Sequence, residues 1–230
     1  KKAGIHTQYI LTSESEETGQ AFITVDEAGQ NTILVYGGAN MTLSATDVEM
    51  SVDAFIGADF VVAQLEVPFE AIEQAFKIAR KQNITTVLNP APAIELPKSL
   101  LELTDIIIPN ETEAELLTGI SINNESDMKE TATYFLDLGI SAVLITLGEQ
   151  GTYCAYQEQY KMIPACNVKA IDTTAAGDTF IGAFLSELNK DLSNLESAIR
   201  LANQASSLTV QRKGAQASIP TRKEVEAEYN

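Results

Sequence analysis

The chain has 230 residues, with 15 Lys and Arg against 32 Asp and Glu, and its net charge of −17 is not interrupted by any basic run. This charge disfavours both nucleic acid and an anionic membrane surface as partners. Because 45% of the residues are hydrophobic, we expect a folded, soluble globule. A bound nucleotide is compatible with the charge, since backbone N–H groups and a metal ion can neutralise phosphates locally.

The cysteine and histidine content argues against zinc and triad chemistry. Cys154 and Cys166 lack CxxC spacing, and His6 is the sole histidine, so neither a zinc site nor a Ser-His-Asp triad is supported. Two isolated thiols are typical of a reducing compartment, and we expect a cytoplasmic protein. The sequence contains no apolar stretch of transmembrane length and no signal peptide at its start.

The first part of the chain predicts a small antiparallel β-sheet. Alternating polar and apolar residues favour extended segments at residues 8–12, 20–25 and 32–36, with a turn at 26–30 between the last two. We expect residues 1–40 to form a β lid, and residues 41–230 to form one larger domain.

From residue 58 onward, apolar runs of strand length alternate with helical periodicity. This alternation predicts an α/β fold in which crossover helices join buried parallel strands. The expected strands are residues 60–65, 85–88, 105–108, 142–147, 152–156 and 160–163. The expected helices are residues 71–79, 112–117, 125–138, 179–188, 195–210 and 223–229.

Polar residues follow four of these strands in succession. Because the carboxyl ends of parallel strands meet at one edge of a sheet, the four segments predict a binding crevice there. The segments are Gln64-Leu65-Glu66, Asn89-Pro90-Ala91-Pro92, Pro109-Asn110-Glu111-Thr112-Glu113 and the run from Thr146 to Gly151. Each also has a structural interpretation: a solvated carboxylate at Glu66, a capping box of Asn110 and Glu113, and turn glycines at 148 and 151.

The segment Asp172-Thr173-Thr174-Ala175-Ala176-Gly177-Asp178 leads into a predicted helix. Its small residues would let the first N–H groups of the helix approach an anion, and Asp178 would stand as a base beside a bound phosphate. That pairing suggests phosphoryl transfer to a hydroxyl. A plain helix cap made by Thr and Asp side chains is the alternative. No Gly-rich loop precedes a Lys-Ser/Thr pair, so a P-loop is excluded.

Four segments in this order resemble the ribokinase family of carbohydrate kinases. They are Asn89 to Pro92, Pro109 to Glu113, Asp172 to Asp178, and Arg212-Lys213-Gly214-Ala215-Gln216. The resemblance implies a three-layer α/β/α sandwich with a mostly parallel central sheet and a small β-sheet lid. It also implies transfer of the ATP γ-phosphate to the 5-hydroxyl of D-ribose, with Mg²⁺ and K⁺ as cofactors and a homodimer formed through the lid.

The resemblance further implies a role for each matching residue. Asp178 matches the catalytic base, and Ala175, Ala176 and Gly177 match the anion hole. Glu66 matches a sugar contact, and Asn110 and Glu113 match the motif that organises magnesium and phosphate. The adenine-nucleotide pocket is matched by Thr146, Leu147, Gly148, Glu149, Gln150, Gly151 and Asn203. The loops that hold the monovalent cation are matched by Asp172, Thr174, Thr209, Arg212, Gly214 and Ser218.

The sequence departs from the family at its start. Family members begin with βα units that carry an aspartate and a Gly-Gly-Lys-Gly-Ala-Asn type segment for the sugar, and neither is present here. We therefore expect an N-terminal part outside these 230 residues, without which sugar binding, stability and kinase activity would suffer. Two alternatives stay open: a kinase for a fructose, a deoxy sugar or a nucleoside, and an inactive nucleotide-binding module.

Overall fold

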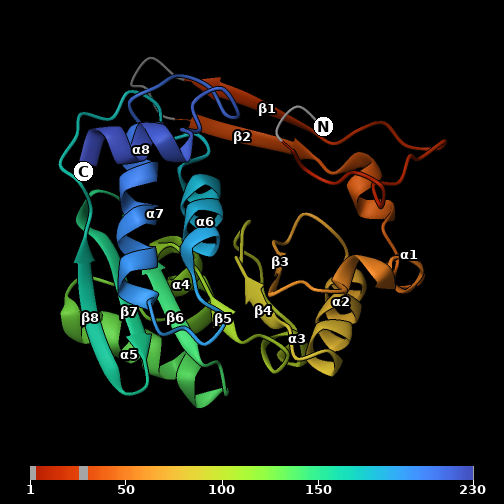
Figure 1. The fold of residues 1–230 in the computed structure, drawn as a ribbon, viewed down its shortest axis with the longest axis horizontal. Helices are drawn as coiled ribbons and strands as arrows, with labels where there is room; N and C mark the ends of the chain where they lie inside the picture. The colour runs from red at the N-terminus through yellow and green to blue at the C-terminus, as the bar shows by residue number, and fades with distance from the viewer. Residues whose placement is uncertain (1–3, 26–30, 230) are drawn as a thin grey trace.

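The computed structural model describes residues 4–25 and 31–229, and its centre is a six-stranded sheet (Figure 1). In spatial order the strands are β3 (Phe60–Ala63), β4 (Thr85–Leu88), β5 (Ile106–Ile107), β6 (Ala142–Thr146), β7 (Gly151–Tyr156) and β8 (Gln159–Pro164). The first four strands pair in parallel, and the hairpin of β7 and β8 continues the sheet in antiparallel pairing. The expected mostly parallel sheet is confirmed, although β3 and β6 end before Gln64 and Leu147.

Helices cover both faces of the sheet, which confirms the three-layer α/β/α architecture (Figure 1). One face is covered by α2 (Phe69–Lys81), α3 (Lys98–Leu101), α4 (Glu111–Thr118) and α5 (Glu125–Asp137). The other face is covered by α6 (Ala176–Glu187) and α7 (Leu195–Thr209). Outside these layers lie α1 (Ala45–Met50), α8 (Arg222–Tyr229) and the short 3-10 turns η1 (Gly38–Thr42), η2 (Val52–Phe55) and η3 (Gly148–Gln150). No helix in the described ranges is long and apolar enough to cross a membrane.

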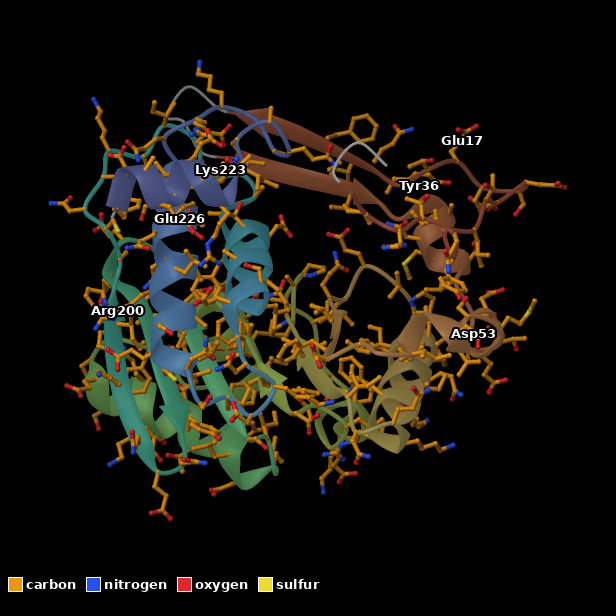
Figure 2. The ribbon with its side chains drawn as sticks, in the orientation of Figure 1. Glu17, Tyr36, Asp53, Arg200, Lys223 and Glu226 are labelled. Atoms are coloured by element: carbon orange, nitrogen blue, oxygen red, sulfur yellow. The ribbon has the colours of Figure 1, made fainter. Side chains whose placement is uncertain are left out.

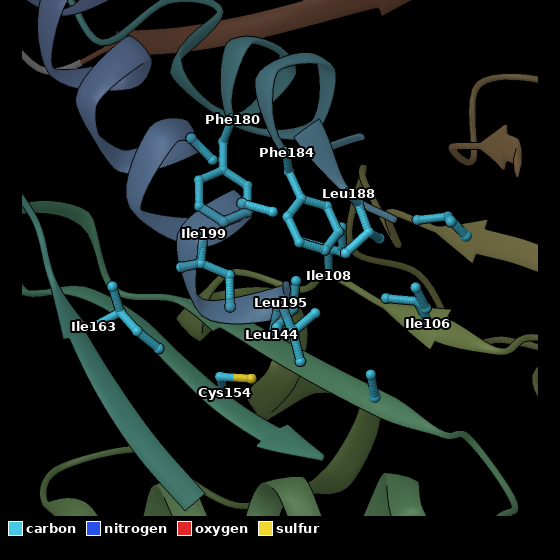
Figure 3. Close-up of a cluster of buried hydrophobic side chains, with 14 residues drawn as sticks. Ile106, Ile108, Leu144, Cys154, Ile163, Phe180, Phe184, Leu188, Leu195 and Ile199 are labelled. Atoms are coloured by element: carbon cyan, nitrogen blue, oxygen red, sulfur yellow. The ribbon is translucent and has the colours of Figure 1, made fainter. Parts of the chain in front are cut away.

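Alternating side chains of the strands build the two halves of the core. Ile106 and Ile108 pack with α6 and α7, whereas Ile107 between them packs with α5. Figure 3 shows Phe180 and Phe184 of α6 above the sheet, with their ring centroids 6.2 Å apart. Burial of an aromatic or branched side chain of this kind stabilises the fold by about 1.5–3 kcal/mol. The apolar runs of the parallel strands therefore fix the position of α6, whose first residues belong to the candidate site.

The lid consists of two strands, β1 (Gln20–Val25) and β2 (Asn31–Tyr36), in antiparallel pairing. It lies across the end of the molecule that also holds the start of α6 and the end of α7 (Figure 1). The expected third strand at residues 8–12 is wrong, because Ile10 N–H donates to the Thr7 carbonyl and closes a turn there. The expected turn at residues 26–30 lies outside the described residues.

Side chains tie the preceding segment to the lid. The Tyr36 hydroxyl donates a 2.8 Å hydrogen bond to Glu16 Oε2. In Figure 2, Tyr36 and Glu17 mark this region, while Lys223 and Glu226 mark α8. The lid and α8 lie on the same side of the molecule as the carboxyl ends of the parallel strands (Figure 1).

Candidate active site

The carboxyl ends of the parallel strands bring together the segments that the sequence singles out. Asn110 and Thr146 form a parallel bridge, and Thr146 N–H donates to the Pro109 carbonyl at 2.9 Å. One strand further, the Asn89 amide donates to the Ile108 carbonyl at 2.9 Å, and Leu65 N–H donates to the Ala91 carbonyl at 2.7 Å. The four strand-end segments are thus neighbours along one edge, as expected.

Asn110 and Glu113 form a complete capping box at the start of α4. Glu113 N–H donates to Asn110 Oδ1 at 2.8 Å, and Asn110 N–H donates to Glu113 Oε2 at 2.8 Å. The Asn110 amide adds a 2.9 Å bond to Glu113 Oε1. Glu113 is only 6% exposed, and burial raises the pKa of its carboxyl group against the opposing effect of the Asn110 backbone bond. The structural interpretation of this pair is therefore confirmed, and it leaves lone pairs on the carboxylate for water.

The segment from Thr146 to Gly151 makes a tight turn that contains η3. Leu147 N–H donates to the Gly151 carbonyl at 2.8 Å, and Gln150 N–H donates to the Leu147 carbonyl at 3.0 Å. Gly151 has a φ of 110°, and a Cβ atom there would overlap the Ile163 carbonyl oxygen. Only glycine fits this position. Gly148, Glu149 and Gln150 are exposed.

Asn203 is buried, and its side chain makes three hydrogen bonds within the protein. Its Oδ1 accepts from the Thr152 hydroxyl at 2.9 Å, and its amide donates to the carbonyls of Ile163 at 3.1 Å and Pro164 at 3.2 Å. Asn203 therefore joins α7 to β7 and to the end of β8, and every polar atom of its side chain already has a protein partner.

The entrance to α6 has no side-chain cap. Its N-cap residue Ala175 adopts a left-handed conformation with φ 61°, and Ala176 N–H donates to the Thr173 carbonyl at 3.2 Å. Within residues 4–25 and 31–229, the N–H groups of Ala175, Gly177 and Asp178 have no acceptor. The plain-cap interpretation is therefore wrong, because the first-turn donors are left available at the positive end of the helix dipole.

The space in front of this turn is open. Gly177 and Asp178 are exposed, and a Cβ atom placed on Gly177 would meet no described atom within 4 Å. Available backbone donors, the helix dipole and room for a ligand together define an anion-binding geometry. Asp178 is the acidic residue of the same first turn.

Asp172 links the loop before α6 to the loop after α7. Its Oδ2 accepts from Gly214 N–H at 2.9 Å, and its Oδ1 accepts from Thr174 N–H at 3.0 Å. The Gly214 bond, followed by the bonds to Thr174, lowers the pKa of Asp172 to about 2. Asp172 is consequently ionised over the whole physiological pH range.

Three other residues of the expected cation loops have side chains that bond within the protein. The Thr209 hydroxyl lies 3.0 Å from the Thr179 hydroxyl, the Ser218 hydroxyl donates to the Ala215 carbonyl at 2.7 Å, and Arg212 pairs with Glu224 at 2.8 Å. At these three positions a cation would therefore rely on backbone carbonyl oxygens. In the described part of the chain, no group of three or more His, Cys, Asp or Glu could hold a metal ion.

Glu66 is exposed beyond the end of β3, and its backbone N–H donates to Gln64 Oε1 at 2.6 Å. Two surface hollows of about 300 and 450 Å³ lie elsewhere, one between α1 and α2 and the other beside the hairpin of β7 and β8. None of the expected site residues lines either hollow. The candidate site is defined by strand ends and the α6 entrance, and these hollows are separate from it.

One contact at the α6 entrance is not predicted from the sequence. The Ser206 hydroxyl of α7 donates to the Ala176 carbonyl at 3.0 Å. The available signal is weak: Ser206 and Thr209 are three residues apart and so lie on one face of the helix.

A family model described as pfkB family carbohydrate kinase matches residues 1–222. The chain belongs to this family of carbohydrate kinases. A Staphylococcus aureus (strain COL) protein named Ribokinase is 63% identical over 225 residues, which cover 98% of this chain and 74% of that protein. A Salmonella typhi protein named Deoxyribokinase is 34% identical over 219 residues, which cover 95% of this chain and 71% of that protein.

Solved structures of ribokinases have the same fold as this chain. The structure of Arabidopsis thaliana ribokinase complexed with ribose and ATP matches with a TM-score of 0.87 at 33% identity, covering 97% of this chain and 73% of that one. The ribokinase structure from Giardia lamblia matches with a TM-score of 0.83 at 30% identity, covering 94% and 73%. The chain thus corresponds to about three quarters of these relatives.

Proposed function

We propose that this protein is an ATP-dependent sugar kinase that transfers the γ-phosphate of ATP to the 5-hydroxyl of D-ribose. The observation that carries the proposal is the uncapped entrance of α6, where available N–H groups and the Asp178 carboxylate share one turn. The 63% identity to a protein named Ribokinase supports ribose as the sugar, against 34% for one named Deoxyribokinase.

Asp178 would act as the base. Its carboxylate accepts the proton of the sugar hydroxyl while that oxygen forms a bond to the γ-phosphorus. The bond from this phosphorus to the β–γ bridging oxygen breaks, and ADP leaves with the electron pair. Phosphoryl transfer depends more on positioning and charge stabilisation than on a strong base, so an ionised aspartate suffices.

The anion hole would be formed by the first turn of α6. The sequence assigns Ala175, Ala176 and Gly177 to this role, and their N–H groups differ in the structure. Ala176 N–H already donates to Thr173, so Gly177, together with Ala175 and the Asp178 backbone, supplies the available donors. These donors are fixed before the reaction and need no reorganisation when charge develops on the phosphate.

The nucleotide would bind along the strand ends. We assign the adenine-nucleotide pocket to the turn from Thr146 to Gly151, whose exposed backbone can approach a flat base, with Asn203 supporting the β8 end behind it. Mg²⁺ would supply charge neutralisation on the phosphates of ATP. The side-chain oxygens of Asn110 and Glu113 would hold this ion through water, because Mg²⁺ keeps several waters and binds few carboxylates.

A monovalent cation, K⁺, would lie between the loops that Asp172 holds together. Residues 174, 209, 212, 214 and 218 would hold it, and at 209, 212 and 218 the ligands would be carbonyl oxygens, because the side chains there bond to other protein groups. The ion would add positive potential near the anion hole. The ionised Asp172 would keep the two loops at a fixed separation.

On the sugar side, Glu66 would contact ribose, and residues 1–40 would close over it as a lid on the 41–230 core. Phe22 and Leu34 are direct cross-strand partners and are 54% and 69% exposed, so they share one apolar face of the lid. This face supports a homodimer formed through the lid. Sedimentation of wild type and of a Leu34→Lys variant tests it, since the variant should shift towards monomer.

Both thiols, Cys154 and Cys166, are free, which agrees with the reducing cytoplasm that we propose. The kinase assignment itself is tested by a substrate panel with ATP, in which products are identified by mass and phosphorus NMR. We expect D-ribose to give ribose 5-phosphate with a higher kcat/KM than 2-deoxyribose, fructose or adenosine. Binding of an ATP analogue without turnover of any acceptor would instead identify an inactive nucleotide-binding module.

A further inference from the structure

The peptide unit between Ala176 and Gly177 has a hydrogen bond on one side and an available donor on the other. Its carbonyl oxygen accepts from the Ser206 hydroxyl of α7 at 3.0 Å. Its N–H is that of Gly177, which has no acceptor in the described parts of the chain and belongs to an exposed residue. Because a peptide unit is planar and trans, fixing the carbonyl oxygen also fixes the direction of the N–H.

The geometry points to Ser206 as a positioning residue that orients the Gly177 N–H towards the transferring phosphate. This inference rests on the proposed function of the α6 turn as the anion hole. The Ser206 side chain acts only through the peptide unit. Its hydroxyl binds the Ala176 carbonyl oxygen, and the Gly177 N–H of the same unit would meet the phosphate.

Three further hydrogen bonds join the end of α7 to the α6 turn and the loop before it. The Thr209 hydroxyl lies 3.0 Å from the Thr179 hydroxyl, and both residues are buried. The Val210 carbonyl accepts from Ile171 N–H at 2.7 Å and from Asp172 N–H at 3.1 Å. The end of α7 therefore binds α6 at Thr179 and the preceding loop at residues 171 and 172. Ser206 makes the hydrogen bond to the peptide unit of the anion hole.

The hydrogen bond from Ser206 also polarises the peptide unit between Ala176 and Gly177. A hydrogen bond to a carbonyl polarises the amide, which makes the N–H at the other end a stronger donor. The helix itself offers the Phe180 N–H to the same oxygen, so losing the hydroxyl leaves no buried acceptor without a partner. A Ser206→Ala variant should consequently fold while its Gly177 N–H loses part of its orientation.

The test compares Ser206→Ala with Ser207→Ala and Ser206→Thr. Ser207 is the next residue of the same helix, and its hydroxyl donates to the Asn203 carbonyl within α7 at 2.7 Å, so it controls for loss of a helix hydroxyl. Removal of a complete oxyanion donor costs about 10²–10³-fold in kcat, and a donor that is only misoriented should cost about tenfold. We expect Ser206→Ala to lower kcat about tenfold with KM for ATP and ribose within about twofold. Ser206→Thr should restore most of the turnover, and Ser207→Ala should retain that of wild type.

A second readout does not depend on turnover. The amide resonance of Gly177 should shift when ADP and aluminium fluoride, which together mimic the transferring phosphoryl group, are added to wild type, and Ser206→Ala should weaken this response. Equal kcat values for Ser206→Ala and Ser207→Ala, or an unchanged Gly177 response, would overturn the role of Ser206. Absence of ribose turnover in wild type would count against the proposed function, and the Gly177 response would then decide the inference alone.

Discussion

The carboxylate of Asp172 accepts a 2.9 Å hydrogen bond from the backbone N–H of Gly214, 42 residues later in the chain. Through its second oxygen it also accepts from Thr174 N–H, so one ionised group closes the loop before α6 onto the loop after α7. The α6 turn that would receive the phosphate is therefore held by a contact whose strength depends on the charge of a single side chain.

Asp172→Asn should reduce stability in a way that depends on pH. The bonds from Gly214 and Thr174 lower the pKa of Asp172 to about 2 in the folded protein, below its ordinary value of 3.8. A lowered folded pKa contributes stability that is present above about pH 4 and is lost as the pH falls towards 2. Urea unfolding of both proteins at several pH values should show a stability difference that narrows over this window. A difference that stays constant with pH would contradict the role assigned to this carboxylate.

Asn203→Ala should destabilise the protein by about 2 kcal/mol, because it leaves the Thr152 hydroxyl and two carbonyls of the β8 end without their partner. The matched control is Asn123→Ala, whose exposed amide donates to a single carbonyl at 3.2 Å and should change stability by less than about 0.5 kcal/mol. Urea unfolding measures both. Equal effects for the two variants would show that the Asn203 network adds nothing to the fold.

Glu113→Gln should improve stability relative to wild type as the pH rises, while it lowers kcat. Burial raises the pKa of Glu113 in the folded state, so the ionised carboxylate becomes a stability cost as the pH rises through and above its ordinary value near 4.5. The stability of the Gln variant relative to wild type should accordingly improve between pH 4 and pH 7. Its kcat should fall, and more Mg²⁺ should be needed for half-maximal activity. A Mg²⁺ dependence equal to that of wild type would remove Glu113 from the proposed ion site.

Much of this fold follows from patterns in the sequence, and the exceptions have physical reasons. The runs at 85–88 and 142–147 predict buried strands, and strands form at Thr85–Leu88 and Ala142–Thr146. The Asn110 capping box places the start of α4 at Glu111, one residue before the start that the helical pattern predicts. The segment 8–12 has strand-like residues, but no strand among the described residues pairs with it, and a local turn forms instead.

The α6 entrance could be located from the sequence, while its geometry could not. Thr173 and Thr174 look like capping residues, yet the left-handed Ala175 takes the N-cap position and leaves the N–H groups available. Ser206 was missed because its contact depends on how α7 packs on α6, which no local pattern records.

The central claim is that Asp178 is the base of an ATP-dependent ribose kinase, and turnover of Asp178→Asn tests it most directly. The amide keeps the size of the side chain and removes its ability to accept a proton at the reacting hydroxyl. We predict that kcat for D-ribose falls by about 10³-fold while the affinity for an ATP analogue stays within about threefold of wild type. Turnover equal to that of wild type would contradict the claim.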